Sequence, residues 1–168
     1  YANHPMRLFY YSYDVGESSR SSRTYYFTIF ELAFEKTVFP YILLHSQTMQ
    51  KYAKFDSSGG VQDVQITLEG EYQNQFNLYA TRGYEIEVLE IFTHDVLEFL
   101  SHRGTNFSIE FAGNKMYIYD DLHITNLREL ANMFNVVQRI FDKIGPLLTR
   151  MRDDFAVLHP YYLEQDKF

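Results

Sequence analysis

A long stripe of apolar side chains near the carboxyl end constrains the fold of this chain more than any other feature. The spacing of three and four residues matches one face of an α-helix and predicts a helix over residues 126–151. Asn126 is expected to be the N-cap, with Glu129 three residues on in a capping-box-like pattern. The stripe consists of Leu127, Leu130, Phe134, Val137, Phe141, Ile144, Leu148 and Met151.

Three further apolar residues widen this stripe, which favours a helix that covers a sheet over a coiled coil. They are Val136, Ile140 and Leu147. Pro146 lies within the stripe and clashes with a regular helix, so a bend or break is expected near Gly145. Residues 152–168 contain several charged residues and an aromatic patch at Tyr161 and Tyr162, and we expect a partly ordered tail there.

Much of the remaining chain alternates apolar and polar residues or is rich in aromatic residues, which is typical of β-strands. The polar loop 14–23, the turn 70–75 and Gly113-Asn114 each predict an antiparallel pairing of the strands that they join. Large side chains alternate on both sides of residues 24–35, so both faces of that strand are expected to be covered. The expected strands are residues 6–13, 24–35, 39–44, 63–69, 76–80, 107–111 and 115–119.

Two short helices are expected in tandem between the fifth and sixth strands. Residues 84–92 have helical spacing, and Thr93 can cap a second helix that ends at residue 102 before Gly104. The sequence therefore predicts one α+β domain over residues 1–168. It contains an antiparallel sheet of about six to seven strands, two short tandem helices and one long carboxyl-terminal amphipathic helix.

Composition excludes several classes of protein. The chain has 168 residues, of which 46% are hydrophobic and 18% aromatic, so it is neither disordered nor of low complexity. A net charge of -7 disfavours nucleic acid as a partner. The absence of cysteine excludes disulfides and thiolate sites and fits a reducing compartment. No apolar run approaches the roughly 18 to 20 residues that a membrane span requires.

Familiar catalytic and cofactor motifs are absent. The sequence contains no G-x-G-x-x-G, P-loop, H-E-x-x-H or G-x-S-x-G pattern. We therefore predict no cofactor, and we expect the chain not to be an enzyme.

A group of tyrosines on the first two strands is the candidate binding surface. Tyr11, Tyr13 and Tyr25 are expected on adjacent strands, and Arg7 adds a positive charge nearby. Tyrosine is favoured at interfaces because it offers a large rigid ring with a polar tip. The same residue is also common on half-buried strands, which is the structural alternative.

A second cluster offers an alternative chemistry. Asp120, Asp121 and His123 place two carboxylates and an imidazole within four residues, and His94 could join them after folding. Such side chains bind divalent cations, so the cluster suggests a metal-dependent hydrolase. Alternatively, the same residues form a polar loop whose acids lie near a helix amino terminus, where negative charge is favoured.

Several segments together resemble a bacterial family. They are RLFYY at residues 7–11, YYFTIFEL at 25–32, Phe39-Pro40, LEGEYQNQFNLY at 68–79 and GYEIEVLEIFTHDV at 83–96. Their order is similar to that in uncharacterised bacterial membrane-anchored proteins with a domain of unknown function. His94 stands where that family commonly has proline after the capping threonine.

The resemblance implies a membrane span upstream of Tyr1, so that this chain is a fragment of a longer protein. We expect a non-enzymatic interaction or sensing domain that lies in water beside the membrane, on the cytoplasmic side. A protein partner is expected, and its identity and the oligomeric state do not follow from the sequence. The resemblance brings no catalytic residues with it.

Overall fold

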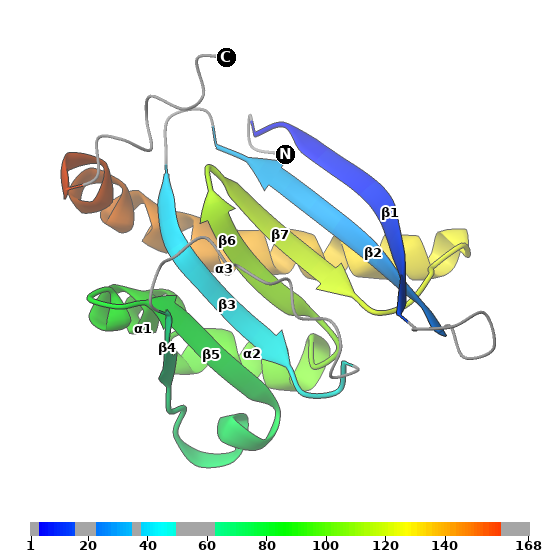
Figure 1. Ribbon diagram of the computed structural model, residues 1–168, viewed down its shortest axis with the longest axis horizontal. Coiled ribbons are helices and arrows are strands. Elements are labelled where there is room, and N and C mark those ends of the chain that lie inside the picture. Colours follow the sequence, from blue (N-terminus) through cyan, green and yellow to red (C-terminus); the bar gives the residue numbers. More distant parts are fainter. Residues whose placement is uncertain (1–3, 16–22, 35–37, 50–62, 159–168) are drawn as a thin grey trace.

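Seven strands form one antiparallel sheet in the computed structural model, which describes residues 4–15, 23–34, 38–49 and 63–158. Their order across the sheet is β1-β2-β7-β6-β3-β5-β4 (Figure 1). The strands are β1 (Met6–Val15), β2 (Arg23–Ala33), β3 (Phe39–Ser46), β4 (Asp63–Ile66), β5 (Phe76–Thr81), β6 (Ser108–Gly113) and β7 (Lys115–Asp120).

In the described ranges, three α-helices accompany the sheet. They are α1 (Glu85–Ile91), α2 (His94–Arg103) and α3 (Leu127–Leu158), and a 3₁₀-helix, η1 (Gly70–Asn74), precedes β5. The predicted α+β class, with its antiparallel sheet, two short tandem helices and long last helix, is confirmed. None of the helices in the described part of the chain is long and apolar enough to cross a membrane.

The three predicted hairpin pairings are present. β1 pairs antiparallel with β2, β4 with β5, and β6 with β7. The last pair turns at Gly113 and Asn114, and Gly113 has a φ of 59°, a conformation that suits glycine. The other neighbours in the sheet join strands that are far apart in sequence.

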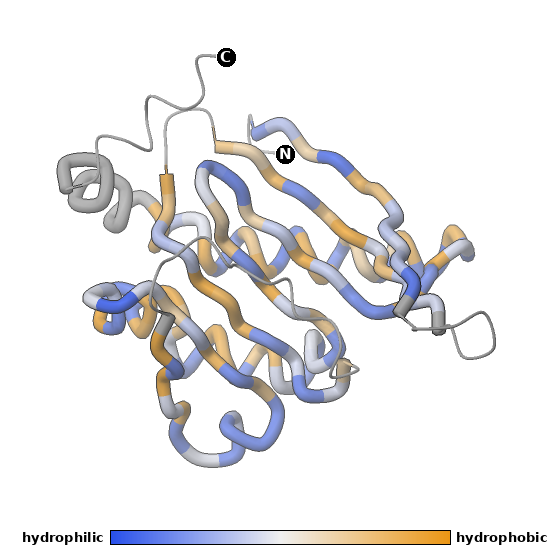
Figure 2. The backbone as a smooth tube through the Cα atoms, viewed as in Figure 1, coloured by the Kyte–Doolittle hydropathy of each residue, from blue (hydrophilic) through white to orange (hydrophobic). Residues whose placement is uncertain are grey.

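All three helices lie behind the same face of the sheet (Figure 1). Alternate residues of β2 point toward them, and Phe30 and Leu32 are buried there together with Ile140 and Ile144 of α3. Figure 2 shows hydrophobic and hydrophilic residues alternating along α3, as expected for a helix with one buried face. This face contains the main hydrophobic core.

Two details of α3 differ from expectation. Of the bend or break expected near Gly145, the break does not occur: the helix continues past Pro146 to Leu158, and Ile144 and Leu148 on either side are buried against the core. Leu127 was expected in the apolar stripe, yet it is 82% exposed because it lies in the first turn, where the helix extends beyond the sheet.

The helix ends are otherwise close to the predictions, except that Thr93, at the N-cap of α2, makes no capping hydrogen bond with its side chain. The Asn126 side chain accepts a 2.8 Å hydrogen bond from the backbone N–H of Arg128, which fits the predicted N-cap. α3 includes residues 152–158 of the expected tail, and residues 159–168 lie outside the described part of the chain. The turn expected at residues 70–75 is η1, which buries Tyr72.

Candidate functional site

The face of the sheet away from the helices, called here the aromatic face, buries a second apolar cluster. The pairing of β1 with β2 places Phe9 opposite Ile29 and Tyr11 opposite Phe27, so these side chains share this face. Large side chains thus lie on both sides of β2, as predicted. The cluster consists of Tyr25, Phe27, Ile29, Leu43, Met49 and Tyr119, with Tyr13, Tyr41, Tyr79 and Tyr117 packed against it.

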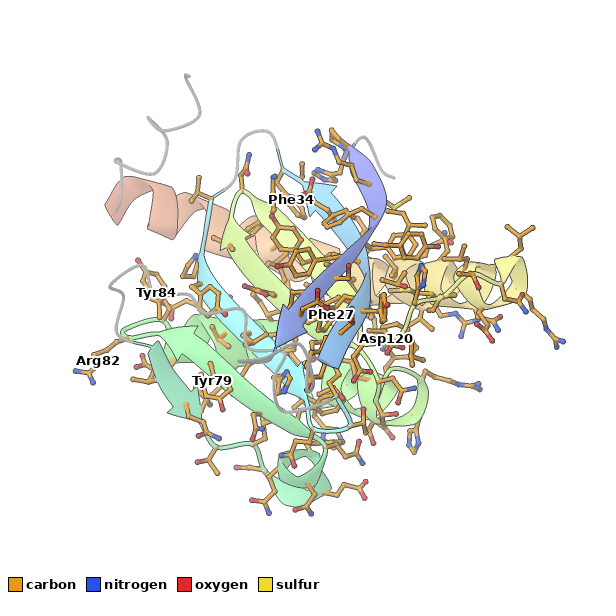
Figure 3. All side chains as sticks on the ribbon, turned by 45° about the vertical axis from the view of Figure 1, so that its right-hand side comes forward. Phe27, Phe34, Tyr79, Arg82, Tyr84 and Asp120 are labelled. Carbon is orange, nitrogen blue, oxygen red and sulfur yellow. The ribbon has the colours of Figure 1, made fainter. Side chains whose placement is uncertain are left out.

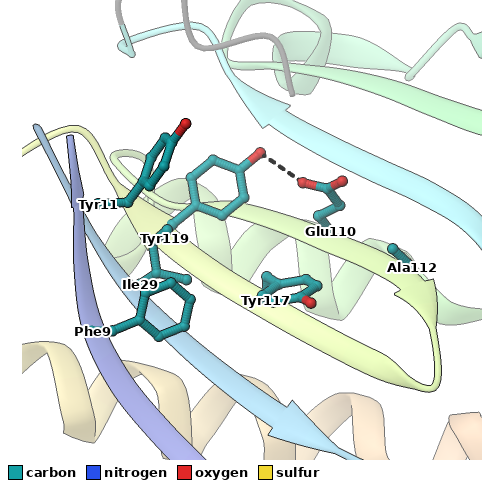
Figure 4. A pocket seen from close by; sticks show the side chains of 7 residues that line it. All are labelled: Phe9, Tyr11, Ile29, Glu110, Ala112, Tyr117 and Tyr119. Carbon is teal, nitrogen blue, oxygen red and sulfur yellow. Dashed lines mark hydrogen bonds between the residues drawn. The ribbon is translucent and has the colours of Figure 1, made fainter. Parts of the chain in front are cut away.

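A cavity of about 300 Å³ opens into the aromatic face (Figure 4). Four neighbouring strands, β1, β2, β7 and β6, contribute its walls, so the order of the strands creates it. Its volume is at the lower end of the range for small-molecule sites, and apolar walls with few polar groups are typical of such sites. The lining of this aromatic cavity consists of Phe9, Tyr11, Ile29, Glu110, Ala112, Tyr117 and Tyr119.

Glu110 is the acidic group of the aromatic cavity. It projects from β6 in the middle of the sheet and is only 8% exposed. Burial raises the pKa of Glu110 to about 7, although hydrogen bonds from Tyr119 and Tyr41 partly oppose this effect. Both the neutral and the ionised carboxyl are therefore accessible near neutral pH.

Tyr119 holds this carboxyl in place. Its hydroxyl donates a 3.3 Å hydrogen bond to Oε2 of Glu110, and Figure 4 shows the two groups side by side at the cavity wall. Burial, with the nearby Glu110 charge as a further cause, raises the pKa of Tyr119 well above its usual value near 10. The phenol consequently keeps its proton and remains a donor.

The structure brings the four sequence-predicted binding residues to the aromatic face. Tyr11 lines the cavity, and Tyr13 and Tyr25 stack beside it with ring centroids 5.4 Å apart. Arg7 lies on the same face, where its Nε is 3.8 Å from Glu31 Oε1. Their role in binding remains a prediction.

Sequence reasoning missed most of the cavity, including Glu110 and Tyr117. Residues 107–111 alternate apolar and polar side chains, and Glu110 stands at a polar position of that pattern, so no sequence signal indicates that its carboxyl is buried. The cavity also requires β2 beside β7, a pairing between strands more than eighty residues apart in the chain. No local pattern reveals that pairing.

The structure does not assemble the predicted metal cluster. Within residues 4–15, 23–34, 38–49 and 63–158, no group of three or more His, Asp or Glu side chains could hold a metal ion. Asp120 is buried at the end of β7, where the chain leads toward α3 (Figure 3). His123 is exposed and packs against Tyr10 and Tyr26, with ring centroids 4.8 Å and 5.5 Å away.

His94 is occupied elsewhere, because its Nδ1 lies 3.2 Å from the hydroxyl of Tyr72. The alternative metal site therefore does not form, because its two histidines contact other residues, although the Asp120 and Asp121 carboxyls lie beside each other.

A serine–histidine contact lies on the same side of β6 as Glu110. Ser108 Oγ is 3.3 Å from His45 Nδ1 and accepts a 3.0 Å hydrogen bond from the backbone N–H of Ser46. Ser108 is fully buried and also contacts the sulfur of Met49 at 2.9 Å. A buried hydroxyl held by the backbone links β6 to β3 and is not presented to a substrate.

Comparison with known proteins identifies a shared fold. No protein-family model matches the chain, and no curated protein matches it. A solved structure does: the crystal structure of the mycobacterial trehalose monomycolate transport factor A, TtfA, with a TM-score of 0.51 at 10% sequence identity. The match covers 79% of this chain and 70% of the TtfA chain.

The chain has a TtfA-like fold. At this identity the likeness concerns the fold alone. The resemblance to bacterial membrane-anchored proteins stays a prediction.

Proposed function

We propose that this chain is a non-enzymatic interaction and sensing domain that binds a small organic ligand in the aromatic cavity. The observation that carries the proposal is the cavity itself. It has a volume of about 300 Å³ and is lined by four aromatic residues and one buried carboxyl. Apart from the tyrosines, Glu110 is the one titratable group among the seven lining residues. A mostly apolar lining with a few polar groups is typical of a site that recognises a small molecule.

The position of the cavity also supports this proposal. It lies on the aromatic face, opposite the core that α3 covers, so a ligand can occupy it without disturbing the main core. A domain that binds without transforming its ligand is consistent with the fold of a transport factor such as TtfA.

The proposal includes a membrane tether. The sequence resemblance supports a membrane span upstream of Tyr1, and the absence of cysteine fits the cytoplasmic side of that membrane. Fractionation of the full-length protein tests this point. The proposal expects the protein in the membrane fraction and this domain accessible to protease from the cytoplasmic side; a protein recovered entirely in the cytosolic fraction contradicts the tether.

A ligand screen with two matched variants tests the binding site. Ala112→Phe adds a ring to the cavity wall, whereas Ala131→Phe makes the same change at an exposed position of α3. Ligand-observed NMR with a library of small organic compounds should find binders for the wild type and for Ala131→Phe. The same compounds should lose at least roughly tenfold in affinity for Ala112→Phe, because the added ring occupies their space.

Either of two results overturns the proposal. One is a library without any binder for the folded wild-type chain. The other is a set of binders whose affinities are unchanged by Ala112→Phe, because these compounds then occupy another part of the molecule.

A further inference from the structure

Two buried glutamates on the aromatic face have different partners. Glu31 is 6% exposed, and its carboxylate lies 3.2 Å from Lys115 Nζ and 3.8 Å from Arg7 Nε. Glu110 is similarly buried, yet in the described ranges no Lys, Arg or His lies within ion-pair distance of it. Phenol hydroxyls contact it instead. The face therefore holds one buried acid with its cations and one without.

Aromatic rings surround the acid that lacks a cation. Phe9, Tyr11, Tyr117 and Tyr119 are four of the seven residues that line the cavity, and none of the seven is basic. The face of an aromatic ring carries partial negative charge and attracts cations, most strongly where water is excluded. The carboxyl and the ring faces that surround this small cavity therefore both favour a cationic ligand.

We propose that the ligand of the aromatic cavity carries a small organic ammonium group, which pairs with Glu110 and contacts the surrounding rings. This inference rests on the proposed function and specifies the chemistry of its ligand. A volume of about 300 Å³ suits an alkylammonium group of a few carbons and is too small for a large amphiphile to enter whole. The net charge of -7 also favours the approach of a cation over that of an anion.

Binding of a permanent cation should depend on pH through Glu110. The cation requires the ionised carboxylate, so protonation of Glu110 below about pH 7 competes with binding. The groups that face this carboxyl are Tyr117 and Tyr119 from β7, Tyr41 from β3 and Tyr11 from β1, with the Glu31–Lys115 pair nearby. His45 lies farther along β3 on the same face, so a variant must assign the effect to Glu110.

An isosteric pair of probes tests the inference. Choline and 3,3-dimethyl-1-butanol share one shape, but the second has a neutral carbon where choline has its charged nitrogen. Isothermal titration calorimetry at about pH 8 should show choline binding roughly tenfold or more tightly than the alcohol. At about pH 6 this preference should shrink for the wild type.

Matched variants assign the effect to residues. Glu110→Gln should abolish the preference for choline and its pH dependence, while Glu31→Gln removes the same charge from the same face and should keep both. Tyr11→Leu, at a half-exposed position on the edge strand, should weaken choline more than the alcohol, because it removes a ring face.

The outcomes separate this inference from the proposed function. Equal binding of both probes, or a preference that survives Glu110→Gln, contradicts the proposal of an ammonium ligand but not the proposed binding site. Suppose that neither probe binds, while other library compounds bind the wild type and not Ala112→Phe. This result also contradicts the ammonium ligand and supports the binding site. If no compound binds the folded chain at all, both fail.

Discussion

At the scale of single residues, Glu110 and Asp120 bind protons in the folded state that they release on unfolding. Burial raises the pKa of Glu110 from 4.5 to about 7, and burial together with the neighbouring Asp121 raises that of Asp120 from 3.8 to about 7. The folded state therefore holds more protons than the unfolded state between these values. The free energy of unfolding should fall as pH rises from about 4 to about 7 and then level off.

Glu110→Gln tests this linkage. The amide is never charged, so the variant should match the wild type near pH 4 and be more stable at about pH 8. The upper limit of the gain is about 3 kcal/mol, which corresponds to the shift in the Glu110 pKa. Urea denaturation across this pH range measures it. Asp120→Asn should further reduce the dependence of the free energy of unfolding on pH. An unchanged pH profile in both variants contradicts the assignment of this dependence to Glu110 and Asp120.

Thr28 connects β2 to the segment that leads into α3. Its buried hydroxyl donates a 2.6 Å hydrogen bond to the carbonyl of Leu122 and accepts a 3.1 Å bond from the N–H of Ile124. Thr28→Val keeps the shape and removes both bonds, so it should lower the free energy of unfolding by about 1–3 kcal/mol.

Hydrogen exchange at the Ile124 amide distinguishes this effect from a loss of packing. Exchange should accelerate in Thr28→Val and stay slow in Thr28→Ser, which keeps the hydroxyl. Equal exchange rates in the two variants would falsify the hydrogen-bond explanation.

At the scale of elements, sequence patterns located nearly every strand and helix, because the period of the apolar residues or the richness in aromatic residues marks each of them. The predictions that differ from the structure concern residues where a local sequence rule and the packing of the core disagree. Pro146 is exposed on α3, and the buried residues Ile144 and Leu148 flank it, so packing maintains the helix despite the proline. Leu127 has the right spacing, yet no described element covers it.

Pro146→Ala should therefore stabilise the protein. A proline in a helix interior is about 3 kcal/mol less favourable than alanine, and the stiffer unfolded chain of the wild type offsets about 1 kcal/mol. We expect a net gain of about 2 kcal/mol in the free energy of unfolding, measured by urea denaturation. Arg139→Ala, at another exposed position of α3, is the control and should change it by less than about 0.5 kcal/mol. A loss of stability in Pro146→Ala would show that the proline ring itself supports the packing.

At the scale of the whole molecule, the sequence showed which strands form hairpins but not how the hairpins assemble. The three predicted pairs are local, whereas β2 pairs with β7, and β3 with both β6 and β5, across long stretches of chain. Those pairings depend on the fit between faces that no single segment encodes. The candidate site arises from them, because Glu110 on β6 meets Phe9 and Tyr11 only when β2 and β7 lie between them. The site was therefore less predictable than the fold class.

The same topology predicts an order of amide exchange across the sheet. β6 and β7 are hydrogen-bonded on both sides and buried on the helix face, whereas β1 is an edge strand with Leu8 and Tyr10 exposed on that face. Exchange at a hydrogen-bonded amide requires local opening, and an edge strand opens without disrupting two neighbours. Hydrogen exchange measured by NMR should thus be slowest at residues such as Ile109 and Ile118 and faster along β1 and the short β4. Exchange along β1 as slow as in β6 would contradict this edge position and indicate that another surface, such as a second copy of the chain, pairs with β1.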